Sequence, residues 1–480
     1  MKLSPDYIKT NLKDIGKKEG IILLKELIDS SNDPIIRKKA LENLADVDIG
    51  RNFAYFEQLF LSDEDPNIRS ITGNILKEKY LSHKKLIRLL EYTLTQSDNI
   101  TQKIFSLKTL SSIDNIKTRK IIIDYLKSFL KPKIKEGIKK YHKKILDFSY
   151  TRSIPQSMVE ISINLILDDF YKKKLGYLTS LKNGKIVALN CESSNLIDIN
   201  NIIGLKYLIN LEHLTLQRNN ITNISEVLFF QKLKCLNLSH NKLARIHNLD
   251  NLDNLEELDL SNNHIKKIEN LQSLKKLKKL SLSNNSIKNI ENLSSLKNLE
   301  TLDISYNEIS EINNLDELKC LNRLNLSFNK IKVIRCLYNL KDLMWLYLND
   351  NKIAQIEGLL TLKKLKGLYL SNNLIEKIRS LENLLKLRKL ELSNNKIKNI
   401  EGLNNLVELQ ELYLDNNDIE NVEGFEGLNN LIMLHLGRNK ISKFRKESID
   451  CLKSLNFIFL NENPLDQKSF LEYQKRIRFP

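Results

Sequence analysis

The chain has few of the residues and motifs that mark most catalytic and metal sites. Among its 480 residues only 14 are glycine, and neither the GxGxxG nor the GxxxxGK[ST] phosphate-binding pattern occurs. The seven histidines include no HExxH metal motif, and the five cysteines include no CxxC pair. We therefore expect no catalytic residue, no cofactor and no metal ion, and we do not expect an enzyme.

Long apolar runs are missing as well. The first residues, Met1-Lys-Leu-Ser-Pro-Asp6, lack the apolar core of a signal peptide, and nowhere do 18 apolar residues follow one another. The cysteines are scattered and odd in number, which argues against a disulfide framework and fits a reducing compartment. These features predict a soluble, cytoplasmic protein that has no membrane partner.

Charge is abundant and unevenly distributed. The formal net charge is +17, and basic residues crowd between Lys117 and Lys144, where only Asp124 and Glu136 oppose them. Such a cluster either binds a nucleic acid or another polyanion, or is a solvated face of a helix. The lysines that we take as candidates for polyanion binding are Lys131, Lys133, Lys135, Lys139, Lys140, Lys143 and Lys144.

Residues 1–174 show the apolar spacing of amphipathic helices, with apolar side chains three and four positions apart. Asp33-Pro34 and Asp65-Pro66 each precede such a run, where an aspartate can cap a helix and a proline fits its first turn. The segments 33–37 and 65–69 share the pattern Asp-Pro-x-x-Arg, and a looser third copy includes Asp98. The pattern resembles HEAT-like helical repeats; an irregular helical bundle is the alternative.

The segment 175–210 predicts a change of architecture. Asn183-Gly184 lies between two stretches with apolar residues at alternate positions, and Asn-Gly accepts the positive φ angles of a tight hairpin turn. The second stretch also begins an atypical first copy of the repeat described next, as expected of a cap at the end of a repeat array. We therefore predict a helical domain over 1–174 and a second domain over 175–480, with 175–210 as its N-terminal cap hairpin and first unit.

Residues 211–452 repeat one pattern, LxxLxLxxNxIxxIxxLxxL, every 22 residues. Alternating leucines predict one short strand in each unit, and the strands should stack in parallel into a concave sheet. The repeated asparagine can both donate and accept hydrogen bonds, so we expect it to satisfy backbone groups where the chain leaves the strand. The period identifies a leucine-rich repeat array. The predicted fold is an α/β repeat solenoid: an all-α, HEAT-like domain followed by a curved leucine-rich repeat domain.

The 22-residue spacing over residues 186–480 resembles the short-repeat class found in the protein phosphatase 1 regulatory subunit with leucine-rich repeats. Residues 453–480 hold a last unit and a partial C-terminal cap, in which an Asn463-Pro464-Leu465 turn precedes Tyr473. The resemblance implies a non-catalytic scaffold or regulatory subunit that contacts a protein partner with its concave face. The partner stays unidentified, with a phosphatase or another enzyme as candidates. Nucleic-acid or polyanion binding through 117–144 is the alternative function.

Outward positions on the sheet should carry the specificity, because the leucines build the core. Aromatic residues gather there from Trp345, the only tryptophan, onward, with acidic residues among them. Grouped aromatic residues on one face are typical of interface hot spots, whereas cross-strand stacking that stiffens the sheet is the alternative explanation. The acids predict a partner with apolar anchors and nearby Lys or Arg. The predicted protein-binding residues are Trp345, Tyr347, Tyr369, Glu391, Glu411, Tyr413, His435, Phe457 and Phe459.

Overall fold

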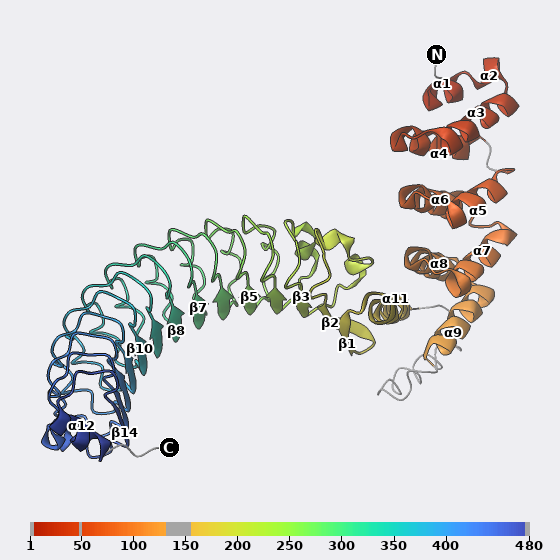
Figure 1. The fold of residues 1–480 in the computed structure, drawn as a ribbon. Helices are drawn as coiled ribbons and strands as arrows, with labels where there is room; N and C mark the ends of the chain where they lie inside the picture. Colours follow the sequence, from red (N-terminus) through yellow and green to blue (C-terminus); the bar gives the residue numbers. More distant parts are fainter. Residues whose placement is uncertain (1–3, 48–49, 131–154, 476–480) are drawn as a thin grey trace. The chain divides into compact units, whose positions relative to one another are not determined.

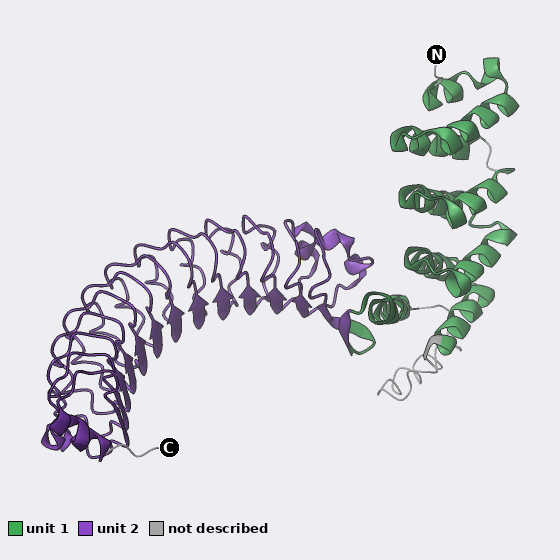
Figure 2. Cartoon of the chain, viewed as in Figure 1, with its two compact units in different colours: residues 1–176, 181–186 green, residues 177–180, 187–480 purple. Residues whose placement is uncertain are grey.

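A computed structural model describes residues 4–47, 50–130 and 155–475 (Figure 1). The chain divides into two compact units, coloured separately in Figure 2. The first unit comprises 1–176 and 181–186, and the second comprises 177–180 and 187–480. The domain boundary between residues 174 and 175 stays a prediction.

The first unit is helical, as the sequence predicts. Its helices pack in consecutive pairs, α3 with α4, α5 with α6 and α7 with α8, and α4 also packs on α6 (Figure 1). The HEAT-like classification of this unit stays a prediction. The elements are α1 (Pro5–Thr10), α2 (Leu12–Ile15), α3 (Lys17–Ser30), α4 (Pro34–Val47), α5 (Phe53–Ser62), α6 (Pro66–Lys79), α7 (Lys84–Gln96), α8 (Ile100–Ile113), α9 (Ile116–Leu130), α11 (Gln156–Phe170) and the π-helix η3 (Tyr171–Leu175).

The two Asp-Pro turns begin helices as predicted. Asp33 accepts a hydrogen bond from the N–H of Ile35 at 2.8 Å, and Asp65 accepts one from the N–H of Asn67 at 2.8 Å. In the third copy the capping residue is Asn99, which bonds the N–H groups of Thr101 and Gln102, and not the neighbouring aspartate. The shared turn is therefore a helix start, and an asparagine serves in it as well as an aspartate does.

The predicted hairpin is divided between the two units, and the second unit continues from it as a parallel sheet. Strand β1 (Leu178–Lys182) turns at Asn183 and Gly184, with φ angles of 55° and 72°, into β2 (Lys185–Asn190). From β2 onward every strand pairs in parallel with its neighbour, in the order β1 to β14. The further strands are β3 (His213–Thr215), β4 (Cys235–Asn237), β5 (Glu257–Asp259), β6 (Lys279–Ser281), β7 (Thr301–Asp303), β8 (Arg323–Asn325), β9 (Trp345–Tyr347), β10 (Gly367–Tyr369), β11 (Lys389–Glu391), β12 (Glu411–Tyr413), β13 (Met433–His435) and β14 (Phe457–Phe459).

The strands line the concave side of this unit, and the return segments form its convex side (Figure 1). The return segments are mostly turns, with 3₁₀-helices η4 (Ile199–Asn201), η5 (Leu205–Tyr207), η6 (Ser225–Phe229) and η7 (Lys446–Ile449). The central residue of each strand from β3 to β13 is a buried leucine, as in Leu346, Leu368 and Leu390, each 0% exposed. The core is thus a continuous column of aliphatic side chains between the sheet and the return segments.

The repeated asparagines bond the backbone as expected. Asn329 donates through Nδ2 to the carbonyl oxygens of Ile304, Leu326 and Ser327 at 3.0, 3.1 and 3.2 Å. Its Oδ1 accepts a hydrogen bond from the N–H of Ile309 at 2.9 Å. One side chain therefore ties its own turn to the preceding unit.

At the C-terminal end, helix α12 (Gln467–Gln474) places the Tyr473 hydroxyl 3.0 Å from the N–H of Leu460, just after β14.

Candidate interaction surface

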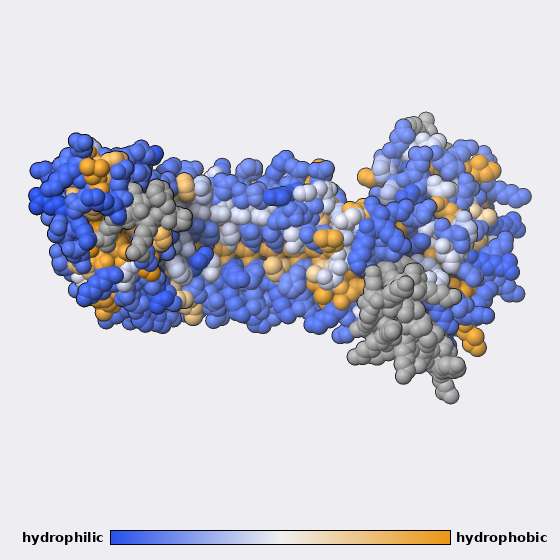
Figure 3. Space-filling model, turned by 60° about the horizontal axis from the view of Figure 1, so that its bottom comes forward, coloured by the Kyte–Doolittle hydropathy of each residue, from blue (hydrophilic) through white to orange (hydrophobic). Residues whose placement is uncertain are grey.

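The nine predicted binding residues all lie on the concave face of β9 to β14. Each strand there has one outward position before and one after a buried central residue, which is leucine in β9 to β13 and Ile458 in β14; the first outward position of β10 is Gly367, which has no side chain. Because the strands pair in register, equivalent side chains lie next to each other. Tyr347 lies next to Tyr369, and His435 lies next to Phe459. In the space-filling view of Figure 3, a narrow apolar band flanked by hydrophilic residues runs over the middle strands of the repeat array.

The ring side chains of this face stack across the strands. Tyr347 and Tyr369 have ring centroids 4.4 Å apart, and His435 stacks between Tyr413 at 4.5 Å and Phe459 at 4.2 Å. Cross-strand stacking, the alternative explanation for these aromatic residues, is therefore present. We call these five residues the aromatic ladder. Neighbouring rings cover each other's faces within two stacks, and Phe459, at the end of the second stack, is 36% exposed.

Lys389, which the sequence did not single out, joins the two parts of the aromatic ladder. Its Nζ lies 4.7 Å from the ring centroid of Tyr413 and 5.7 Å from that of Tyr369. It also forms ion pairs of 3.1 Å with both Glu391 and Glu411. Although desolvation lowers the pKa of Lys389, its hydrogen bonds to these two carboxylates outweigh desolvation and raise the pKa above its ordinary value. The lysine is thus charged and held in place.

The acidic side chains leave this region with a net negative charge. Glu391 and Glu411 share the single ammonium of Lys389, and Asp415 adds a third carboxylate. Asp415 accepts a hydrogen bond from the N–H of Gly437 at 2.9 Å, and its other oxygen lies 3.6 Å from Nδ1 of His435. Three carboxylates therefore face one lysine, and the excess favours a cationic group from a partner.

Trp345 is half-buried, although the repeat register predicts an exposed position. The reason is Gly367, which lies directly opposite on β10. A Cβ atom at Gly367 would lie 2.4 Å from Cε3 of Trp345 and 2.9 Å from Cε2 of Tyr369. The indole therefore lies across the bare backbone of the neighbouring strand, and one side of it is covered.

A second aromatic pair lies in the turns that follow β7 and β8. Tyr306 and Phe328 stack with centroids 3.9 Å apart and are 51% and 40% exposed. Both have positive φ angles, 52° and 56°, at a turn position where five other units have asparagine: Asn262, Asn284, Asn372, Asn394 and Asn416. A bulky residue in this conformation costs roughly 1 kcal/mol or more, whereas asparagine tolerates it better.

His435 should make the stability of this surface depend on pH. Burial lowers the pKa of His435, and the opposing effects of Asp415 and Glu411 do not restore it; Lys389 also faces the ring and lowers the pKa further. At pH values below about 6.5, the ordinary pKa of histidine, the unfolded chain thus binds more protons than the folded chain. The unfolding free energy therefore decreases as the pH is lowered. We expect His435→Phe, which keeps the stack, to flatten the decline in urea-denaturation stability between about pH 6.5 and 5. An unchanged pH slope would contradict this origin.

Several other predicted features lie elsewhere. The polyanion-binding candidates Lys131, Lys133, Lys135, Lys139, Lys140, Lys143 and Lys144 lie outside the described residues. Within the described ranges, no group of three or more His, Cys, Asp or Glu side chains is placed to hold a metal ion. No helix in the same ranges is both long and apolar enough to cross a membrane.

Family models agree with this architecture. The leucine rich repeat model matches residues 209–265 and 407–465, and a model of two copies of leucine rich repeats matches 275–320 and 385–427. The second unit is therefore a leucine-rich repeat domain. No curated protein matches the chain.

Solved structures of leucine-rich repeat proteins resemble the chain. The internalin inlF from Listeria monocytogenes is 27% identical, with a TM-score of 0.50, covering 61% of this chain and 92% of its own. The protein LIC12759 from Leptospira interrogans is 26% identical, with a TM-score of 0.56, covering 64% and 93%. A chain of the LRIM1/APL1C complex is 25% identical, with a TM-score of 0.51, covering 61% and 55%. The resemblances to a phosphatase regulator and to HEAT repeats stay predictions.

Proposed function

We propose that the protein is a non-catalytic interaction scaffold that binds a protein partner on the concave face between Arg323 and Phe459. Leucine-rich repeat domains are general protein-interaction scaffolds, and their curvature creates an extended binding surface. One of the three solved structures named above is the LRIM1/APL1C complex. The proposal for this chain depends on its own concave side chains.

The observation that carries the proposal is the uneven distribution of aromatic residues. Strands β3 to β8 present small, polar or charged side chains, whereas β9 to β14 present Trp345 and the aromatic ladder. At one end Arg323 lies 5.4 Å from the ring centroid of Tyr347. Trp, Tyr and Arg are the residues most enriched in interface hot spots. Stacking within the sheet also holds the rings in place before binding, which lowers the entropy cost of ordering them.

The arrangement of the rings favours a protein over a nucleic acid. Base stacking needs an open ring face, but the rings of the aromatic ladder cover one another. The hydroxyl group of Tyr369 stays neutral, since burial and the neighbouring Tyr347 raise the pKa of Tyr369 to about 12. The excess of carboxylates around Lys389 repels phosphate and attracts Lys or Arg. No observation supports the alternative of polyanion binding through 117–144.

The exposed pair of Tyr306 and Phe328 extends the proposed surface. Aromatic residues at this turn position cost stability that asparagine would not, and although the two rings stack on each other they stay 51% and 40% exposed. Residues kept in an unfavourable conformation while exposed are common where a partner contacts them. The pair is one turn away from β7 and β8, next to the strands that carry Arg323 and Trp345.

A narrower form of the proposal makes the chain a regulatory subunit of an enzyme such as a phosphatase. It derives from the class of repeat and from the concave binding face. Copurification from the native host, followed by a phosphatase assay of the bound fraction, tests it. Phosphatase activity that follows the tagged chain supports the narrower form, and an enzyme-free partner contradicts it.

The double substitution Trp345→Ala and Tyr369→Ala tests the proposed surface. Each truncated hot-spot residue typically costs about 2 kcal/mol or more, so capture of the partner should fall roughly a hundredfold or more. Partners captured from the native host by the wild-type chain are identified by mass spectrometry and then quantified with each variant. The control carries Ser281→Ala and Thr301→Ala, on the same face of β6 and β7, and should bind normally. Capture that survives the aromatic substitutions, with unchanged circular dichroism, contradicts the proposed surface.

A further inference from the structure

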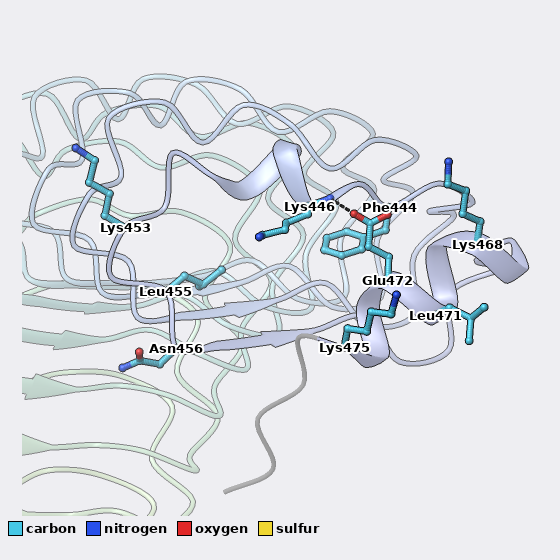
Figure 4. Close-up of a pocket in the computed structure, with 9 residues that line it drawn as sticks. All are labelled: Phe444, Lys446, Lys453, Leu455, Asn456, Lys468, Leu471, Glu472 and Lys475. Atoms are coloured by element: carbon cyan, nitrogen blue, oxygen red, sulfur yellow. Dashed lines mark hydrogen bonds between the residues drawn. The ribbon is translucent and has the colours of Figure 1, made fainter.

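A pocket lies at the C-terminal end of the leucine-rich repeat domain, between helix α12 and the last unit (Figure 4). Its volume is about 870 Å³, within the range of sites that hold a ligand or a peptide side-chain cluster. The pocket is separate from the aromatic ladder, none of whose residues lines it. The lining residues are Phe444, Lys446, Lys453, Leu455, Asn456, Lys468, Leu471, Glu472 and Lys475.

The apolar part of the pocket results from the end of the repeat array. The leucine that begins each unit is covered by the next unit, so Leu409 and Leu431 are both 0% exposed. Leu455 holds the same position in the last unit, has no following unit and is only half-buried. Helix α12 leaves its own Leu471, another lining residue of the pocket, 51% exposed. Of the three apolar lining residues, Leu455 and Leu471 thus remain incompletely covered and form the apolar floor, whereas Phe444 is only 1% exposed.

The rim of the pocket is basic. Lys446, Lys453, Lys468 and Lys475 line it, and among the described residues none of their ammonium groups has a carboxylate within 4.0 Å. Lysines elsewhere in the domain are often paired, as Lys440 is with Asp418 at 2.6 Å. The one carboxylate of the pocket, Glu472, accepts a hydrogen bond from the backbone N–H of Lys446 at 2.7 Å. Four lysines against one engaged glutamate make the pocket a site for anions.

We propose that this pocket binds an acidic peptide segment of a protein, with its carboxylates on the lysines and one apolar side chain on the floor. In Figure 4 Lys453 and Lys468 lie at opposite ends, with Phe444 and Glu472 between them. Ammonium groups spread in this way suit several carboxylates along an extended chain better than a single phosphate. The N–H of Lys446 is already bonded to Glu472 and does not face an anion. The apolar floor matches the apolar side chains that peptides carry and that inorganic polyanions lack.

The test uses the full chain and a fluorescein-labelled peptide in which Asp and Glu residues flank a central Leu-Phe pair. Binding is measured by fluorescence anisotropy at about 150 mM salt, where distant surface charges are largely screened. We expect the triple variant Lys446→Glu, Lys468→Glu and Lys475→Glu to lose about tenfold or more in affinity, since each contact at a partly exposed site contributes modestly. A wild-type chain that does not bind the peptide overturns the proposal.

A matched control separates the pocket from the general charge of the chain. Lys319, Lys341 and Lys363 are exposed lysines of three successive units outside the pocket, and replacing all three with Glu changes the net charge by the same amount. We expect this control to retain affinity within about twofold. Equal losses in both triple variants would mean non-specific attraction and overturn the proposal.

Two further measurements separate an acidic peptide from other polyanions and from the concave surface. Leu471→Ser should weaken peptide binding severalfold, because the residue is exposed and its loss removes only the apolar contact. If inorganic polyphosphate displaces the peptide equally well from the wild-type chain and from the Leu471→Ser variant, the assignment to a peptide is overturned. The Trp345→Ala and Tyr369→Ala variant should bind the peptide normally, so failure at this pocket and failure of the concave surface are distinguishable.

Discussion

Replacing Gly367 with alanine is expected to displace the Trp345 indole and to disrupt partner binding at the concave face. The new Cβ would lie 2.4 Å from Cε3 and 2.6 Å from Cζ3 of Trp345, distances that no relaxed contact has. It would also lie 2.9 Å from Cε2 of Tyr369, so neither ring can move toward the other to make room. Trp345 must then leave the surface of the sheet. We expect a stability loss of only about 1–3 kcal/mol, because the core leucines stay in place.

The single tryptophan of the chain makes this displacement measurable. The emission of Gly367→Ala should shift to the red and be quenched more readily by acrylamide, because the indole becomes more exposed. Gly50→Ala is the control, since a Cβ there meets nothing within 4 Å. Partner capture should fall with Gly367→Ala as it does with Trp345→Ala. Unchanged emission and unchanged capture would show that the glycine does not position the indole.

Replacing Asn329 with leucine is expected to have the largest effect on stability. The substitution leaves the N–H of Ile309 and the carbonyl oxygens of Ile304, Leu326 and Ser327 without the side chain that bonds them. Each buried polar group that loses its partner costs about 1–3 kcal/mol. We therefore expect the unfolding free energy to fall by about 4 kcal/mol or more.

Urea denaturation followed by Trp345 fluorescence measures this loss, because Trp345 lies in the next unit along the array. The control is Asn399→Ala, which removes an exposed asparagine from another unit and should change stability by less than about 0.5 kcal/mol. A decrease for Asn329→Leu as small as that of the control would mean that water replaces the asparagine without cost.

The sequence predicted the parallel sheet, the hairpin and the asparagine contacts because each follows from a local pattern. Alternating leucines can bury only one face, and Asn183-Gly184 favours one turn. The asparagine equivalent to Asn329 recurs in each unit from residue 211 on, at the point where the chain leaves the strand. Each of these features needs only the residues of one unit and the knowledge that the next unit is the same. The outward positions of the aromatic ladder could be predicted from the same repeat register.

Features that depend on differences between neighbouring units were missed. Lys389 was one basic residue among many until the structure placed it between Glu391 and Glu411 and over two tyrosine rings. The half-burial of Trp345 depends on the absence of a side chain at Gly367, one full unit later. The available signal for this burial was a glycine at a strand position where the other units carry a side chain. In the helical unit, Asn99 and not Asp98 caps α8, because the two adjacent polar residues compete for one position.

Stacking and binding, which were alternatives at the level of sequence, are compatible in the structure. Tyr413, His435 and Phe459 stabilise one another across three strands, yet their edges remain accessible. A ring fixed by its neighbours loses little entropy when a partner contacts it. The irregular side chains of β9 to β14 therefore both stiffen this end of the sheet and form the proposed hot spot.

Site-specific photo-crosslinking tests the proposed binding surface most directly. A benzophenone-bearing phenylalanine replaces Tyr369 in one chain and Ser281 in another, on the same concave face but in different units. Both chains are irradiated in extract of the native host, and the crosslinked proteins are identified by mass spectrometry. The account predicts a protein crosslinked from position 369 and little or none from position 281. Crosslinking from position 281 alone, or from neither position while the partner still copurifies, would contradict it.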